Sequence, residues 1–287
     1  MASGNRNSAN GSSMKARRVV SYIVLVFVTV MCLFWFYLLL INTTKTNNQL
    51  QLGFDAVPGT NFLNNWKSLI NGTLPILSGL FNSLIISAGC VLCSTYFSAM
   101  TAYAIHAYDF KLRKFMFAFI LAVMMIPTQV TTLGFLKLVD ALKLKNSFIP
   151  LIVPTIAAPV VFFYIKQYME SSLPLEIVEA SRIDGSGEFM TFNRIVLPML
   201  KPAIAVQAIF TFVNNWNNYF VPALLLTDEK KKTLPILIAQ LRSADWLKFD
   251  MGQVYMMIAF SIFPVIVVYL MLSKHIVQGI ALGSVKG

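Results

Sequence analysis

Acidic residues are scarce in this chain, and they gather in one short segment. The 287 residues include 12 Asp and Glu, and five of these are Glu170, Glu176, Glu179, Asp184 and Glu188. Carboxylates form strong hydrogen bonds with basic groups on a partner. The segment lacks a nucleophile paired with a histidine and lacks a set of metal ligands, so the chemistry that we expect here is docking and not catalysis.

Residues 172–198 predict two short helices joined by a turn. Pro174 suits the first turn of a helix, and Gly185 suits the left-handed residue that follows its end. A second, amphipathic helix is indicated by apolar residues at helical spacing, namely Phe189, Phe192, Ile195 and Val196. Pro198 and Pro202 separate it from the next apolar stretch. A solvated loop would explain the charges alone, but it would not need two capped helices.

A stripe of neutral polar residues lies in an otherwise apolar stretch. Its members are Gln207, Thr211, Asn214, Asn217 and Asn218, with Trp216 beside them. Amides and an aromatic ring suit a substrate with many hydroxyl groups and an apolar ring face. We therefore predict a translocation path for a sugar-like molecule, to which Gln129, just past Pro127, would contribute. The alternative, that these side chains bond to neighbouring helices, stays open.

The composition identifies the bilayer as the solvent of this chain. It is 57% hydrophobic and 12% charged, too little polar surface for a soluble globule of this length. The net charge of +11 comes from Lys and Arg between apolar runs, which are typical of membrane-flanking anchors and not of a nucleic-acid surface. Cys32, Cys90 and Cys93 lie inside apolar runs and indicate neither a disulfide framework nor a metal site.

The elements that must position these residues are transmembrane helices. Charge-free stretches occur at 19–44, 68–108, 115–136, 146–165, 202–227 and 251–273. Because about 20 apolar residues cross the hydrocarbon as a helix, we predict an all-α polytopic membrane protein with six transmembrane helices. The second helix should run from Ile76 to His106, and residues 61–68 should form an interfacial helix. Residues 1–14, rich in Ser, Asn and Gly, should be disordered, and residues 15–287 should form one permease domain.

The flanks of the first helix predict the orientation. Lys15, Arg17 and Arg18 precede it and only Lys45 follows closely, which places the N-terminus in the cytoplasm. With six crossings, the C-terminus is also expected in the cytoplasm. The first apolar run, from Val19 to Ile41, is too long for a removable signal core, so we expect it to remain as an anchor.

The acidic segment resembles a known motif. Glu179-Ala180-Ser181, then Asp184-Gly185, then Ile195-x-Leu197-Pro198 resembles the EAA motif of ATP-binding-cassette (ABC) importer permeases, with Ser181 where that family expects Ala. Most of the chain resembles the carbohydrate-uptake, maltose-permease-like branch, and in particular its shorter six-helix partner. This likeness rests on Asn82-Ser83, Ala102-Tyr103-Ala104, Ile126-Pro127, Trp216-Asn217 with Pro222, and the C-terminal Gly283-Ser284-Val285-Lys286-Gly287.

The resemblance implies a type I ABC importer permease fold and a mechanical role. The loop would be a coupling helix in a groove of a cytoplasmic ATPase, where Glu179 meets a basic residue and Ala180 and Ser181 allow close approach. Gly185 would supply the turn. The implied partners are a homologous second permease, two ATPase subunits that carry ATP and magnesium, and an extracytoplasmic sugar-binding protein, in a bacterial-type cell membrane.

Two other classes of function compete with this interpretation. The chain has no phosphate-binding loop, so it would not hydrolyse ATP and would bind no cofactor itself. A secondary transporter or channel would predict inverted repeats and would leave the acidic segment without a purpose. The absence of an acid inside the predicted spans argues against proton coupling. A membrane scaffold would leave the polar stripe without a purpose beyond packing.

Overall fold

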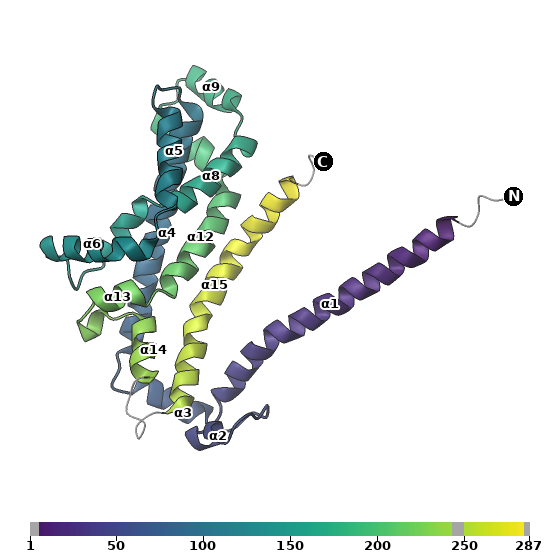
Figure 1. Ribbon diagram of the computed structural model, residues 1–287, viewed down its shortest axis with the longest axis vertical. Coiled ribbons are helices and arrows are strands. Elements are labelled where there is room, and N and C mark those ends of the chain that lie inside the picture. Colours follow the sequence, from purple (N-terminus) through teal and green to yellow (C-terminus); the bar gives the residue numbers. More distant parts are fainter. Residues whose placement is uncertain (1–5, 243–249, 284–287) are drawn as a thin grey trace. The chain divides into compact units, whose positions relative to one another are not determined.

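A computed structural model describes residues 6–242 and 250–283, and within these ranges the regular structure is helical, without a strand (Figure 1). The α-helices are α1 (Arg6–Asn42), α2 (Asn47–Gln51), α3 (Phe62–Ile70), α4 (Ile76–Ala107), α5 (Arg113–Met124), α6 (Thr128–Ala141), α7 (Ile149–Ile152), α8 (Pro159–Ser172), α9 (Leu175–Ile183), α10 (Glu188–Thr191), α11 (Leu197–Met199), α12 (Lys201–Trp216), α13 (Phe220–Leu225), α14 (Leu234–Arg242) and α15 (Met251–Gly283). Short 3-10 helices occupy η1 (Val153–Ile156) and η3 (Glu229–Lys231), and η2 (Phe192–Val196) is a π-helix. The predicted all-α class is confirmed.

The chain divides into two compact units. The first holds α1, α2, α3 and the part of α15 up to Phe260; the second holds α4 to α14 and the part of α15 from Ser261. A helix predicted at 61–68 is observed as α3, and its interfacial position stays a prediction. Disorder was predicted for residues 1–14; residues 1–5 lie outside the described part of the chain, and α1 begins at Arg6. Helix propagation adds one hydrogen bond for each residue that it orders, so a long apolar helix extends into a polar flank.

Asn65 organises the first unit. Its amide donates to the carbonyls of Thr43 and Lys45, at 2.8 and 2.9 Å, and so fixes the chain that follows α1. A Cβ on Gly252 would lie 2.8 Å from this amide, so glycine is required there. Trp66 of α3 packs edge-on against Phe260, with 5.6 Å between ring centroids.

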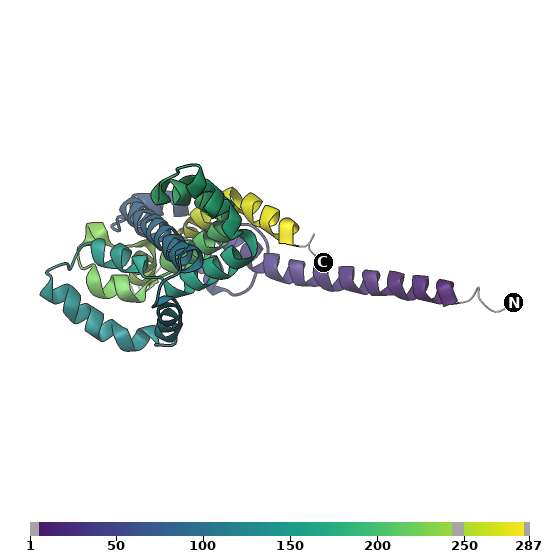
Figure 2. The ribbon, with the colours of Figure 1, turned by 90° about the horizontal axis from the view of Figure 1, so that it is seen from above.

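Helix α4 is the centre of the second unit, and α8 and α12 pack along it (Figures 1 and 2). Its buried face consists largely of small residues, namely Gly79, Ser83, Ser87, Cys90, Ser94, Ser98 and Ala102. Small side chains let helix backbones approach closely inside a membrane. A Cβ on Gly79 would lie 2.5 Å from Cδ1 of Leu237, which shows how close α14 comes. The predicted start of this helix at Ile76 is confirmed, and its end lies one residue past the predicted His106.

Four helices within the described ranges are long and apolar enough to cross a membrane. They are residues 17–42, 76–107, 149–172 and 251–274, and they correspond to the first, second, fourth and sixth predicted stretches. A fifth crossing results if residues 188–199 and 201–216, bent by 79°, are counted as one span. The number six therefore stays a prediction.

The third predicted span, residues 115–136, is broken at Pro127. Helix α5 has 12 residues and α6 has 14, and each is shorter than the roughly 20 that a crossing needs. Figures 1 and 2 show that they point in different directions. Proline lacks the backbone N–H for a helical hydrogen bond and disfavours helical geometry at the residue before it, here Ile126.

Candidate functional site

We call residues 175–199, from α9 to α11, the α9–α11 segment. Helix α9 starts directly after Pro174, which lies just before the first turn and not inside it. The helix ends at Ile183, and Gly185, two residues later, has a φ of +78°, which confirms the predicted left-handed residue. The Gly185 N–H donates to the carbonyl of Arg182 at 3.0 Å, and the Ser186 N–H donates to that of Ser181 at 2.9 Å. These two bonds form a Schellman cap, so the turn is defined by the backbone.

A chain of hydroxyl groups joins the two halves of the segment. Ser181 is 5% exposed, and its hydroxyl donates to the carbonyl of Val178 at 2.7 Å and lies 3.2 Å from Oγ1 of Thr191. Thr191 in turn donates to Oγ of Ser186 at 2.9 Å. Ser181 therefore faces inward, which corrects the expectation that it would lie beside Ala180 on the docking surface. The serine that replaces the family's alanine is used for internal bonding.

The second half of the segment is amphipathic, with one exception to the predicted pattern. Phe192 and Val196, four residues apart, are 2% and 0% exposed. Phe189 was expected on the same face but is 72% exposed. It lies in α10, a single turn directly after the loop, where no other described element covers it.

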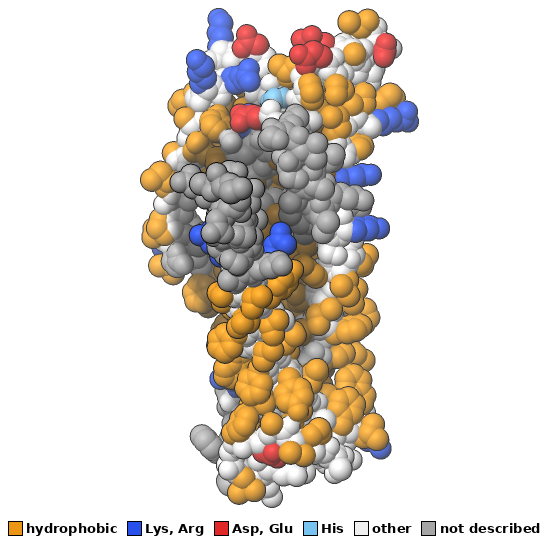
Figure 3. All heavy atoms as spheres, turned by 90° about the vertical axis from the view of Figure 1, so that its right-hand side faces the viewer, with side chains coloured by type: hydrophobic (Ala, Val, Ile, Leu, Met, Phe, Trp, Pro, Cys, Tyr) orange, Lys and Arg blue, Asp and Glu red, His pale blue; other side chains and the backbone are white. Residues whose placement is uncertain are grey.

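The outer face of the segment is free of partners within the described part of the chain. Glu176, Glu179, Ala180 and Asp184 are exposed, and the Glu179 carboxylate has no hydrogen bond or ion pair with a described residue. Ile183 is 86% exposed next to them. Charged side chains gather at the end of the second unit that carries α9 (Figure 3). The face thus combines acidic groups with an uncovered apolar group, and protein interfaces likewise pair apolar contacts with a polar rim.

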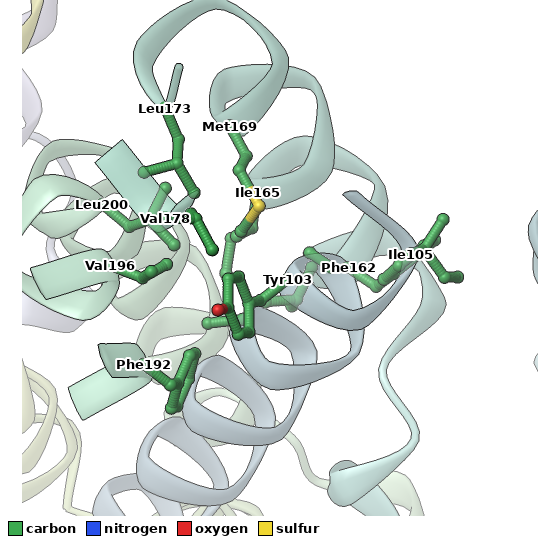
Figure 4. Close-up of a cluster of buried hydrophobic side chains, with 13 residues drawn as sticks. Tyr103, Ile105, Phe162, Ile165, Met169, Leu173, Val178, Phe192, Val196 and Leu200 are labelled. Carbon is green, nitrogen blue, oxygen red and sulfur yellow. The ribbon is translucent and has the colours of Figure 1, made fainter. Parts of the chain in front are cut away.

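The inner face of the segment belongs to the core of the second unit. Val178 is 1% exposed and packs in one cluster with Val196, Leu200, Leu173 and Ile165 (Figure 4). The same cluster includes buried residues of α4 and α8, such as Tyr103 and Phe162. Leu197 packs against this cluster and is partly buried, whereas Pro198 is exposed. The inner face of the segment is therefore packed against α4 and α8 through one continuous cluster.

Glu188 ties the segment to the end of α4. One carboxylate oxygen accepts hydrogen bonds from the hydroxyls of Tyr103, at 3.1 Å, and Tyr108, at 2.5 Å. The other carboxylate oxygen lies 2.8 Å from Nε of Arg182. The Arg182 guanidinium also lies over the Tyr108 ring, with 5.2 Å between Cζ and the ring centroid. The bonds from Arg182 and then from Tyr108 lower the pKa of Glu188. Hydrogen bonds and a counter-ion favour the charged form, so Glu188 is an ionised anchor.

No local pattern in the sequence points to this group. Glu188 was noted only as one of five acids, and Tyr103 only as part of a family resemblance. The partners are 85 and 80 positions away along the chain, so no local spacing points to the contact. His106 adds a second link, because its Nε2 lies 2.9 Å from the carbonyl of Leu173, directly before α9.

The polar stripe is divided between two cavities. Thr211 and Asn214 line a cavity of about 300 Å³ together with Ser94 of α4 and Thr155 of η1. Asn217 and Trp216 line another, of about 320 Å³, with Arg242 and the backbone region of Ser261. Asn215, which the sequence analysis left out, also lines the first cavity and donates to the carbonyl of Thr211 at 2.8 Å.

The residues of the stripe differ from one another in exposure. Gln207 is 6% exposed and lies in the packed face of α12. Trp216 is 3% exposed: it stacks on Phe212 with 5.5 Å between centroids, and its indole donates to the carbonyl of Ser261 at 3.0 Å. Helix α12 ends at Trp216, so Asn218 lies beyond the helical stripe. Gln129 lies at the start of α6, and its side chain is outside the described part of the structure.

Cys90 is buried and, like Cys93, carries a free thiol. The Cys90 thiol donates to the carbonyl of Leu151 at 3.3 Å. Among the described residues, no group of three or more His, Cys, Asp or Glu side chains is arranged to hold a metal ion.

Comparison with known proteins gives a consistent result. Residues 94–281 match the family described as the binding-protein-dependent transport system inner membrane component. The chain is 33% identical to the arabinooligosaccharides transport system permease protein AraQ of Bacillus subtilis, over 94% of this chain and 96% of that protein. It is 28% identical to the trehalose/maltose transport system permease protein MalG of Thermococcus litoralis, over 94% of this chain and 98% of that protein.

A solved structure shares the fold. It is the crystal structure of a bacterial ABC transporter involved in the import of the acidic polysaccharide alginate. One chain of that structure aligns with this chain with a TM-score of 0.79 and 19% sequence identity. The alignment covers 91% of this chain and 97% of that chain. With the match to the family and the relatives, this likeness confirms the resemblance to ABC importer permeases identified from the sequence. The chain belongs to the binding-protein-dependent transport system inner membrane component family, and it is a multi-pass membrane permease subunit.

Proposed function

We propose that this chain forms half of the translocation path of an ATP-driven importer for a sugar or oligosaccharide, and that the α9–α11 segment couples the path to a cytoplasmic ATPase. Two relatives are named for arabinooligosaccharides and for trehalose/maltose, which supports this class of substrate. The amide-lined cavity of α12 has the hydrogen-bonding chemistry that a polyhydroxylated substrate needs.

The observation that carries the coupling role is the two-sided construction of the α9–α11 segment. Its outer face leaves Glu179, Ala180 and Ile183 uncovered, while Val178 on its inner face is buried in the cluster shared with α4 and α8. A partner that binds the outer face can therefore move the membrane helices without an intervening loop. In this arrangement Glu179 accepts a hydrogen bond from a basic residue of the ATPase.

The proposed assembly contains this chain, a homologous second permease, two ATPase subunits and an extracytoplasmic sugar-binding protein. ATP and magnesium bind to the ATPase subunits, and this chain binds neither. With the α9–α11 segment against the ATPase, the end of α4 at Ala107 faces the cytoplasm. The N- and C-termini are then cytoplasmic, in agreement with the basic flank before α1.

Two glycines in the turn of the α9–α11 segment provide the test. Gly185 has φ +78°, whereas Gly187 has φ −67°, and a Cβ on either residue would meet no atom within 4 Å. A side chain at Gly185 costs about 1–2 kcal/mol because L-residues avoid left-handed geometry, and this strain is absent at Gly187. Gly185→Leu and Gly187→Leu therefore differ in backbone strain and not in steric clash.

The measurement is uptake of labelled oligosaccharide by cells, together with the amount of ATPase that co-purifies with the tagged permease. We expect Gly185→Leu to reduce both by about tenfold, at unchanged membrane abundance, because a mispositioned cap alters the docking face by about 1.4 kcal/mol. Gly187→Leu should retain both. Normal uptake with Gly185→Leu would contradict the coupling role, and purification of the wild-type chain without a second permease and an ATPase would contradict the assembly.

A further inference from the structure

A large basic cavity lies at the end of the second unit that carries α9, away from the polar cavities of α12. It has a volume of about 840 Å³ and is lined by the last turn of α4, the loop to α5, the first turn of α5 and the end of α8. Its charged residues are the cations Lys111, Arg113, Lys114 and Lys166 and the carboxylates of Asp109 and Glu170. The cations are in excess, so the cavity attracts an anion.

Lys166 forms the floor of this cavity. Its side chain is 5% exposed, although it carries a charge, and its ammonium group lies 2.5 Å from the half-exposed carboxylate of Glu170. The ammonium also lies 5.9 Å from the centre of the Phe117 ring. A buried ammonium is costly unless it is paired, and one partner leaves further donor hydrogens for a ligand.

The other three cations lie at the rim and leave donors available. Arg113 uses one guanidinium nitrogen for the carbonyl of His106, at 3.4 Å. Lys111 and Lys114 are exposed and form no ion pair with any residue that the structure describes. Helix α5, of 12 residues, begins at Arg113, so its positive end adds to the field at the same place. Such a site suits the oxygens of a phosphate group.

The surface next to the cavity is apolar. Helix α5 buries none of its residues and exposes Phe115, Met116 and Phe119 at 62%, 40% and 54%. Phe115 and Phe119 stack with 6.1 Å between centroids and form an apolar strip along α5 that begins two residues after Arg113. A free phosphate would leave this strip uncovered, whereas a phospholipid presents a phosphate and an acyl chain in this order. Basic pockets between transmembrane helices bind anionic head groups in the same way.

We propose that the cavity between α4, α5 and α8 binds the head group of an anionic phospholipid, with an acyl chain along the exposed face of α5. The phosphate accepts hydrogen bonds from Lys111, Arg113 and Lys114, and Lys166 neutralises it from below. This site is separate from the proposed sugar path and does not depend on which sugar is carried.

The test is native mass spectrometry of the full chain with its co-purifying subunits, in detergent with phosphatidylglycerol or phosphatidylcholine of identical acyl chains. We expect tighter binding of phosphatidylglycerol, and a loss of about 30-fold with the double variant Lys111→Gln/Lys114→Gln, because each basic residue near an anionic lipid contributes a factor of about five. The control Lys137→Gln/Lys230→Gln removes the same charge from exposed lysines elsewhere in the second unit and should bind normally.

Three outcomes would overturn the proposal. The first is equal binding of the two lipids, or phosphatidylglycerol binding that the double variant leaves unchanged. The second is displacement of the lipid by millimolar inorganic phosphate, which would identify a free phosphate as the ligand. The third is loss of the ATPase from the complex of the double variant with lipid binding intact, which would assign the basic surface to a protein partner. An unchanged thermal transition of the double variant establishes that it is folded.

Discussion

The α9–α11 segment and the polar residues of α12 use a helix in opposite ways. In the segment, one face is buried and the other is bare, so that Val178 and Ile183 differ from 1% to 86% exposure within one helix. Along α12, the exposure of the polar residues changes from one turn to the next. Gln207 and Thr211 are buried, whereas Asn214 is exposed in a cavity. In the proposed coupling role α9 needs a rigid buried face, whereas in the proposed path α12 needs polar groups only where a cavity opens.

A charge placed on each side of α9 tests this contrast most strongly. Val178→Asp buries an unpaired carboxylate in the core cluster and should lower the free energy of unfolding by about 3–5 kcal/mol, with loss of the protein from the membrane. Ile183→Asp places the same group in solvent and should leave abundance unchanged while it weakens co-purification of the ATPase. Membrane abundance and pull-down of each variant provide the measurement. Equal loss of abundance in both variants would show that the outer face is also structural.

On α12, the contrast is between Trp216 and Asn214. Trp216→Ala removes a buried ring that stacks on Phe212, and we expect it to lower the stability by about 3 kcal/mol, measured as thermal unfolding in detergent. Asn214→Leu should leave the stability within about 0.5 kcal/mol but reduce oligosaccharide uptake, because Asn214 lines the cavity and has no structural partner among the described residues. Unchanged uptake and substrate range with Asn214→Leu would reduce the stripe to helix packing.

A smaller effect is expected where the chain departs from the family motif. Ser181→Ala restores the alanine that the motif expects but removes the hydrogen bond to the Val178 carbonyl and the polar contact with the buried Thr191, so the stability should fall by about 1 kcal/mol. Ser171→Ala, at an exposed serine that bonds only to the carbonyl of Tyr168, is the matched control. Thermal unfolding of both variants decides the matter, and equal stability would show that the hydroxyl chain does not hold the turn.

The smallest expected effect is a pH dependence at Glu188. In the folded chain the pKa of Glu188 is below its ordinary value of 4.5, which applies to the unfolded chain. Ionised Glu188 therefore stabilises the fold fully above pH 4.5, and this stabilisation is lost as the pH falls through the lowered pKa of the folded chain. Because Glu188 and Arg182 are partly exposed, at 45% and 36%, we expect less than about 1 kcal/mol. Protease sensitivity of the turn at 184–187, compared between pH 7 and pH 3.5, should rise in the wild-type chain and change less in Glu188→Gln. Equal changes in both would exclude Glu188 as the anchor.

Local signals in the sequence identified what depends on neighbouring residues. The start of α4 at Ile76 and the left-handed Gly185 follow from breakers and caps, which act over a few positions. Pro127 predicts a kink and the length of the apolar run predicts one span, whereas the structure has two separate helices, α5 and α6. The inward turn of Ser181, the exposure of Phe189 and the contact of Glu188 with Tyr103 depend on which elements lie opposite. That information is not contained in helical spacing.

The small-residue face of α4 has a consequence for motion. Glycine, alanine, serine and cysteine have few rotamers or none, so a contact made of them loses little side-chain entropy when it forms and needs little repacking when it slides. A shear movement of α4 against α8 and α12 would therefore need little side-chain rearrangement at these small residues. Bulky residues at these positions would interlock the helices and turn a gradual displacement into a barrier crossing.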